Sequence, residues 1–212
     1  MQFQAVIWDM DGVLVDSGEF HYLSWRATTR ALGFDYTREQ FDSDFGMHNS
    51  DILKRLAGDD LSEDFIDHFV QEKEDLFLEM AHNRLQPLDG VLAVLQKLQA
   101  QNIPMAVASS SPRKNIDAVL GELKITQLFQ VVLSVGNLPG KPEPDIFLEA
   151  ARLLDIPAAS CLVFEDSIAG TAAAKSAGMT CIAITTTNPP ERLHKADLII
   201  DRYEDLPDSF FP

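Results

Sequence analysis

The sequence predicts an α/β protein in which a doubly wound parallel sheet carries an inserted helical segment. Two patterns lead to this prediction. After residue 87, short and almost continuous apolar runs alternate with amphipathic helical patterns. Such strands between helices are typical of a parallel sheet with helices on both faces. Residues 17–84, by contrast, show only long helical patterns, with aromatic and leucine residues at three- and four-residue steps.

The first predicted element is a strand over residues 3–8. This run is rich in β-branched and aromatic side chains and stops at the acidic turn Asp9-Met-Asp-Gly12, which predicts a short, buried, central strand. The helical segment follows it directly. We therefore expect two parts, a core made of residues 1–16 and 85–212 and a helical domain made of residues 17–84.

The later elements are expected in regular alternation. Helices are predicted over residues 89–100, 112–123, 144–154 and 168–177. Strands are predicted over residues 104–108, 131–135, 161–164, 181–184 and 198–200.

Composition excludes several classes of protein. The chain has 212 residues, 46% of them hydrophobic and 24% charged, as in ordinary globular proteins. A net charge of −16 disfavours nucleic acid as a partner.

No run approaches the roughly twenty apolar residues that span a bilayer, and residues 1–4 lead straight into a strand, so we expect a cytoplasmic protein without a membrane partner. Cys161 and Cys181 sit in apolar runs, as reduced buried thiols do. No second apolar face is evident, and a monomer is expected.

Polar clusters follow four of the predicted strands, where the carboxyl ends of a parallel sheet meet. Four carboxylates would converge there, from Asp9, Asp11, Glu165 and Asp166. They would repel one another unless a cation lay between them, and the absence of a His or Cys cluster favours Mg²⁺. Lys141 and the serines at 109–111 would offer donors to the oxygens of an anion. A cation beside such donors indicates a phosphoryl-transfer site.

Taken in order, these segments resemble the four motifs of the haloacid dehalogenase superfamily of phosphohydrolases. Asp9 to Ser17 match the Asp-x-Asp-Gly motif with its following Val-Asp-Ser, Ser109 matches the second motif, and Lys141 the third. Glu165-Asp166 match the acidic pair of the fourth. The resemblance covers nearly the whole chain. The helical insert and the phrase Lys-Pro-x-Pro-Asp-Ile-Phe at 141–147 are similar to the β-phosphoglucomutase and sugar-phosphatase branch, which implies a Rossmann-like core under a helical cap.

The resemblance implies Mg²⁺-dependent hydrolysis of a small phosphorylated metabolite, of the sugar phosphate class, through an aspartyl-phosphate. Asp9 would be the nucleophile, and Asp11 would protonate the leaving oxygen and later deprotonate the attacking water. Ser109 would donate to the phosphoryl group, and Lys141 would link the nucleophile to it. The implied metal ligands are Asp9, Asp11, Glu165 and Asp166.

Each of these residues also has a structural interpretation. The acidic turn capped by Gly12 could face solvent, Ser109 could cap the next helix, and Lys141 could be a solvated loop lysine. The acidic pair could simply favour a helix dipole. The occurrence of all four clusters at predicted strand ends favours the catalytic interpretation.

Specificity is expected in the insert, which would cover the sheet edge and contact the leaving group. The candidate substrate-binding residues are His21, Gly46, Asn49, Ser110 and Ser111. His21 matches a histidine of the mutase branch that faces the site, but a partly buried structural histidine explains it equally well. In the mutases an arginine of the loop matching 45–50 grips a second phosphate, and Asn49 stands at that position here. Without that guanidinium water should take the phosphoaspartate more often, which favours a phosphatase over a phosphosugar mutase.

Other functions remain to be separated by experiment. A dehalogenase would lack Asp11, and a phosphonate-cleaving relative would need an imine-forming cap lysine, for which Lys54 and Lys73 are candidates. From a different class, a non-enzymatic phospho-receiver would also phosphorylate an aspartate beside Mg²⁺, but it would be smaller and would lack the insert. A metabolite-binding module would not need the complete set of acids.

Overall fold

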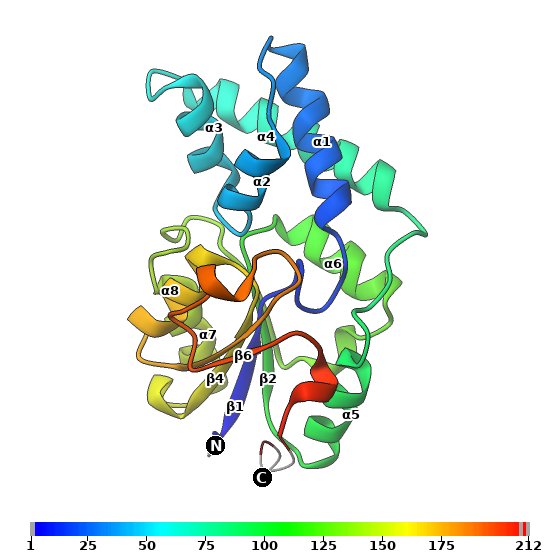
Figure 1. The fold of residues 1–212 in the computed structure, drawn as a ribbon, viewed down its shortest axis with the longest axis vertical. Coiled ribbons are helices and arrows are strands. Elements are labelled where there is room, and N and C mark those ends of the chain that lie inside the picture. The colour runs from blue at the N-terminus through cyan, green and yellow to red at the C-terminus, as the bar shows by residue number, and fades with distance from the viewer. Residues whose placement is uncertain (1–2, 208–209, 211–212) are drawn as a thin grey trace.

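A six-stranded parallel sheet organises the computed structural model, which describes residues 3–207 and 210 (Figure 1). The order of its strands is β3-β2-β1-β4-β5-β6, with β1 at the centre. The strands are β1 Ala5–Trp8, β2 Met105–Ser109, β3 Val131–Ser134, β4 Cys161–Glu165, β5 Thr180–Ile184 and β6 Leu198–Ile200. Each neighbouring pair is parallel. The predicted fold class is therefore confirmed. Residues 1–2, which the sequence analysis placed before the first strand, lie outside the described residues.

Eight α-helices accompany these strands in the described part of the chain. They are α1 Gly18–Ala31, α2 Arg38–Asp44, α3 Asn49–Ala57, α4 Glu63–Ala81, α5 Val91–Ala100, α6 Arg113–Glu122, α7 Asp145–Leu154 and α8 Ile168–Ser176. The strands and helices expected after residue 87 are all present, and their ends differ from the predicted ones by at most two residues. The predicted first strand began at Phe3, but β1 begins at Ala5. The side chain of Phe3 is nevertheless buried in the same core cluster as Val6 and Trp8.

Alternate residues of each strand pack on opposite faces of the sheet. In β1, Val6 and Trp8 point into a cluster that also holds apolar side chains of α5 and α6. Ala5 and Ile7 point into a second cluster, formed with α7 and α8. Both faces are thus covered, which explains why the strands read as continuous apolar runs. Trp8 stacks on Phe164 with ring centroids 4.4 Å apart, so it is a core residue.

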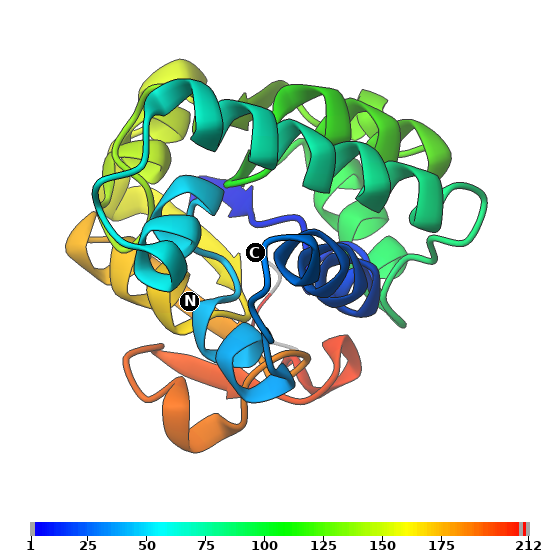
Figure 2. The ribbon, with the colours of Figure 1, turned by 90° about the horizontal axis from the view of Figure 1, so that it is seen from above.

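Helices α1 to α4 lie together beyond the carboxyl end of the sheet (Figure 1), and in the view from above they are nearest the viewer (Figure 2). They have an apolar cluster of their own, in which Trp25 packs against Tyr36 and Phe69. Thr37 begins α2 with a capping box to Gln40, which fixes where that short helix starts. No helix among the described residues is long and apolar enough to cross a membrane.

Candidate active site

The predicted polar residues meet where the central strands end. Asp9 follows β1, Ser109 is the last residue of β2, and Glu165 is the last residue of β4. Because β1 pairs with β2 on one side and β4 on the other, these three positions lie side by side at one edge. The loop before α7 adds Lys141. The strand order therefore brings Asp9, Ser109 and Glu165 together, and the helices of the insert lie beyond this end of the sheet (Figure 1).

A buried lysine joins two of the carboxylates. Lys141 donates hydrogen bonds of 2.6 Å from Nζ to Oδ1 of Asp9 and to Oε1 of Glu165. Its side chain is 0% exposed, so it is not a solvated loop lysine. Burial acts to lower the pKa of Lys141, but the two carboxylates raise it above its ordinary value, and the residue stays an ammonium. Lys141 therefore fixes the Asp9 carboxylate and partly neutralises it.

Glu165 is held in place on both of its oxygens. Oε1 accepts from Lys141, and Oε2 accepts from the backbone N–H of Asp166, from that of Ser167 and from Ser167 Oγ at 2.9 to 3.0 Å. Gly170 packs against this carboxylate so closely that no larger side chain would fit. Glu165 is therefore better suited to position Lys141 than to contact an ion directly.

Three carboxylates form a group that could hold a cation. Ligand oxygens of Asp9, Glu165 and Asp166 all lie within 4.8 Å of one another, and all three residues are buried. Oδ2 of Asp166 accepts from Thr187, whereas its buried Oδ1 has no hydrogen-bond partner among the described residues. An unpaired buried carboxylate oxygen is costly, and a hard divalent cation would satisfy it. The donor set fits Mg²⁺, with Asp9 and Asp166 as the ligands least occupied by other contacts.

The charge state of this group supports the same conclusion. Burial raises the pKa of Asp9 to about 7, and Glu165 also raises it, against the opposing effect of Lys141. Burial and the nearby Glu165 and Asp9 carboxylates raise the pKa of Asp166 well above its usual range. Three carboxylates with one ammonium are short of positive charge, and a divalent cation would correct the deficit.

Asp11 lies apart from this group, although the sequence analysis counted it among the metal ligands. Its carboxylate accepts from Ser17 Oγ at 2.6 Å and from Ser111 Oγ at 2.8 Å, and its Oδ1 lies 3.0 Å from His21 Nε2. Burial acts to raise the pKa of Asp11, but the His21 ring and these hydroxyl bonds lower it to about 2. Asp11 turns toward the insert and is ionised, so its geometry suits proton transfer better than metal binding.

A chain of buried polar groups continues from Asp11 into the insert. The other ring nitrogen of His21, Nδ1, lies 2.9 Å from Lys73 Nζ, and Lys73 in turn donates to Glu74. The two ring nitrogens of His21 thus face Asp11 on one side and Lys73 on the other. His21 is buried and stacks on Phe77. It thus has both of the roles that the sequence left open, a packed side chain that also faces the site.

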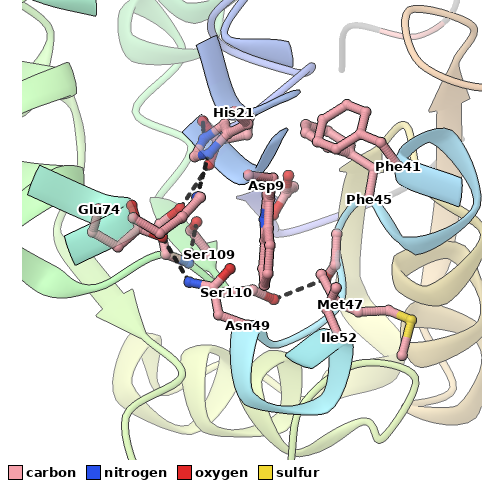
Figure 3. A pocket seen from close by; sticks show the side chains of 15 residues that line it. Asp9, His21, Phe41, Phe45, Met47, Asn49, Ile52, Glu74, Ser109 and Ser110 are labelled. Atoms are coloured by element: carbon pink, nitrogen blue, oxygen red, sulfur yellow. Dashed lines mark hydrogen bonds and ion pairs between the residues drawn. The ribbon is translucent and has the colours of Figure 1, made fainter. Parts of the chain in front are cut away.

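The remaining candidates line a small cavity of about 40 Å³ between the sheet and the insert (Figure 3). Ser109, Ser110, Gly46 and Asn49 all belong to its wall, and so does Ser111. Phe41, Phe45, Met47 and Ile52 line one side, opposite Glu74 and His21 (Figure 3). A volume of this size holds roughly one water molecule. A sugar phosphate is larger than this space, so we expect the insert to move when a substrate binds.

Among the lining residues, Glu74 was not expected from the sequence, and Lys73 was considered only as an imine-forming lysine. Lys73 and Glu74 lie in the charged run Gln71-Glu-Lys-Glu-Asp75, which is typical of a solvated helix face, yet both are buried. A signal for Lys73 was present, because Phe69, Lys73 and Phe77 recur at four-residue steps and share one face of α4. A similar pattern includes Glu74, because Ile66, Val70, Glu74 and Leu78 also recur at four-residue steps along α4, but it does not identify the partners of that carboxylate.

Known proteins resemble this chain in sequence and in fold. The chain matches the family model of haloacid dehalogenase-like hydrolases over residues 6–184. A Bacillus subtilis protein named β-phosphoglucomutase is 32% identical over 220 residues, covering 96% of this chain and 91% of that protein. A Thermotoga maritima protein named phosphorylated carbohydrates phosphatase is 30% identical over 181 residues, covering 83% and 82%. The solved structure of a β-phosphoglucomutase from Clostridium difficile has a TM-score of 0.89 at 28% identity, covering 98% of this chain and 95% of that one.

Proposed function

The chain belongs to the haloacid dehalogenase-like hydrolases and is a phosphoric monoester hydrolase of that family, and from this premise we propose that it is a Mg²⁺-dependent phosphatase of small sugar phosphates. Residues 17–84 would form the cap, and residues 1–16 with 85–212 the catalytic core. The observation that carries the proposal is the Asp9 carboxylate, which Lys141 holds at 2.6 Å in the wall of a cavity that Ser109 and Asp11 also line.

Asp9 would attack the phosphorus atom in line and displace the leaving group, and water would then hydrolyse the aspartyl-phosphate. When bound by Asp9 and Asp166, Mg²⁺ would neutralise charge on the phosphoryl oxygens and hold them against the nucleophile. Lys141 and the Ser109 hydroxyl would bind the remaining oxygens. Each of these side chains is already placed by hydrogen bonds or by the end of its strand, which keeps reorganisation small.

Asp11 would carry the proton in both steps. Since its pKa of about 2 keeps it ionised in the free site, it is ready to take a proton from the attacking water. In the first step, the transfer of the phosphoryl group to Asp9, Asp11 must instead be protonated. An approaching phosphate dianion raises the pKa of a neighbouring carboxyl group, because like charges disfavour ionisation, and would thus help Asp11 to hold the proton it gives to the leaving oxygen.

A phosphosugar mutase is the second candidate, because relatives of that name cover nearly the whole chain. The experiment that separates the two is a Mg²⁺-dependent screen of sugar phosphates and other phosphomonoesters, including β-glucose 1-phosphate with and without a bisphosphate primer. A phosphatase releases one inorganic phosphate for each substrate consumed and forms no isomer. Primer-dependent isomerisation without phosphate release would instead establish the mutase, and no turnover of any phosphomonoester would contradict both.

Magnesium is expected to stabilise the protein more at high pH than at low pH. The pKa of Asp9 rises on folding from 3.8 to about 7, so the metal-free fold binds extra protons and loses stability as the pH rises through that window. Mg²⁺ binds the ionised oxygens and restores the loss. The increase in Tm on adding Mg²⁺ should therefore be larger at about pH 8 than at about pH 5. Equal increases at both pH values, or an undiminished increase in Asp166→Asn, would contradict this assignment of the ligands.

Gly46→Ala is expected to weaken substrate use by holding the cap loop away from the core. Gly46 has φ +86°, and a Cβ added there would overlap Ser167 Oγ. In the closed structure the carbonyl oxygen of Gly46 accepts from Ser110 Oγ at 2.9 Å. We expect kcat/KM to fall about tenfold, because both the strained backbone and the overlap oppose closure. Gly58→Ala tests the cap backbone alone, because φ is also positive there but an added Cβ meets nothing within 4 Å. If kcat/KM falls by the same factor in both variants, the overlap with Ser167 is not the cause of the loss.

A further inference from the structure

Glu74 is a buried carboxylate that the proposed chemistry does not use. It lies in the middle of α4, is 3% exposed, and borders the cavity that Asp9 also lines (Figure 3). Carboxylates are rarely buried to this extent unless they are paired or hydrogen-bonded. The hydrogen-bond partners of Glu74 therefore indicate its role.

Three partners surround Glu74. Its Oε1 accepts from Lys73 Nζ at 2.9 Å and from Asn49 Nδ2 at 2.6 Å, and its Oε2 accepts from Asn115 Nδ2 of the core helix α6. Burial acts to raise the pKa of Glu74, but Lys73, His21 and these hydrogen bonds lower it below its ordinary value. Glu74 thus stays ionised while it faces the cavity.

The ion pair removes the positive charge that the cap would otherwise present. Lys73 is the only lysine or arginine among the described residues that line the cavity, and it is 1% exposed. Because Glu74 pairs with it, the described residues that line the cavity offer no uncompensated lysine or arginine to a second anionic group. Asn49, at the position where the sequence analysis expected a mutase to carry arginine, donates to Glu74 and so supports the carboxylate.

A second cleft, next to the cavity, is also lined by hydrogen-bond acceptors. Glu74 and Asn115 also line a cleft of about 470 Å³ between α4 and α6. Asn115 is 1% exposed, and its Oδ1 has no hydrogen-bond partner among the described residues. Lys114, at the rim, is already paired with Asp75 at 2.7 Å. Glu74 is thus shared by the cavity and this cleft, and the amide oxygen of Asn115 is a second acceptor beside it.

We propose that Glu74 selects the leaving group of the substrate: it excludes leaving groups that carry a second phosphate and favours those that present hydroxyl or ammonium donors toward α4 and α6. This inference rests on the proposed phosphatase function and adds its substrate class. A second phosphate in this place would lie beside a fixed carboxylate, and such like-charge pairs strongly disfavour the wrong ligand. A hydroxyl or ammonium group would instead donate to Glu74 or to the unpaired oxygen of Asn115.

The test compares substrates that differ only in the group near Glu74. We would measure kcat/KM for fructose 1-phosphate, fructose 6-phosphate and fructose 1,6-bisphosphate, and for glucose 6-phosphate and glucosamine 6-phosphate. The variants are Glu74→Gln, which removes the charge but keeps the shape, and Glu72→Gln, which removes the same charge from an exposed position of the same helix.

The wild-type protein should use the better fructose monophosphate at least about tenfold better than the bisphosphate. In Glu74→Gln, which frees the charge of Lys73, the ratio of bisphosphate to monophosphate kcat/KM should rise about tenfold, and that of glucosamine to glucose 6-phosphate should fall. In Glu72→Gln both ratios should stay at their wild-type values.

The outcomes distinguish the inference from the function beneath it. If wild-type protein hydrolyses monophosphates but uses the bisphosphate equally well, or if Glu74→Gln leaves both ratios unchanged, the role of Glu74 is wrong and the phosphatase stands. If no phosphomonoester is hydrolysed, the proposed function fails and this inference fails with it. If Glu74→Gln does not fold, the test is the ratio of monophosphate to bisphosphate kcat/KM in the wild-type protein, and equal use of the two would contradict the inference.

Discussion

Asp9→Asn is expected to abolish turnover of every phosphomonoester that the wild-type protein hydrolyses, with a fall in kcat of about 10⁴-fold or more. The amide is nearly the same shape as the carboxylate but is a poor nucleophile, so no aspartyl-phosphate forms. The measurement is phosphate release at saturating substrate and Mg²⁺. Since the replacement also removes one buried negative charge, the variant should fold and should not be less stable than wild type.

Asp16→Asn provides the matched control for that variant. Asp16 is an exposed acid in the loop that follows the Asp9 turn, so its replacement changes the net charge equally without entering the cavity. It should retain wild-type kcat. Substantial Mg²⁺-dependent turnover by Asp9→Asn would show that another group attacks phosphorus, and the mechanism would have to be rebuilt around that group.

Lys141→Met is the second large effect, and it should reduce both activity and stability. The ammonium that binds Asp9 and Glu165 at 2.6 Å would be lost, and two buried carboxylates would face each other unpaired. Breaking a buried pair in this way typically costs about 3–5 kcal/mol in the free energy of unfolding. Since the transferring phosphoryl group also loses its lysine, kcat/KM should fall by about 10²–10⁴-fold.

A double variant separates the two effects. Lys141→Met with Glu165→Gln removes one positive and one negative charge together, so it should recover much of the stability that Lys141→Met loses, but none of the activity. Lys195→Met, at an exposed position, is the control for loss of a surface lysine. Full activity in Lys141→Met would mean that the lysine only balances charge in the core.

The fold and the central part of the site could be predicted because both follow from order along the chain. Apolar strands between helices specify a parallel sheet, and the carboxyl ends of parallel strands meet at one edge. Asp9, Ser109 and Lys141 are therefore brought together in the structure as the sequence suggested, within a shared site at this edge.

The features that were not predicted depend on the orientation of a side chain or on its partners from distant segments, and a local sequence pattern specifies neither. Asp11 was expected beside the cation, but Ser17, His21 and Ser111 turn its carboxylate toward the insert. Glu74 sits in a run of charged residues that resembles a solvated surface. It is buried because α4 lies against α6, a contact between segments about forty positions apart in the sequence, and spacing along one helix does not reveal such contacts.

The most direct test of the central claim is to quench a single turnover in acid and map the phosphoryl group by mass spectrometry. The account predicts that a labelled substrate leaves its phosphoryl group on the peptide that contains Asp9, that hydroxylamine removes it as it removes an acyl phosphate, and that it decays no more slowly than steady-state turnover requires. Turnover that proceeds with the label on another residue, or with no phosphorylated protein at any time, would contradict it.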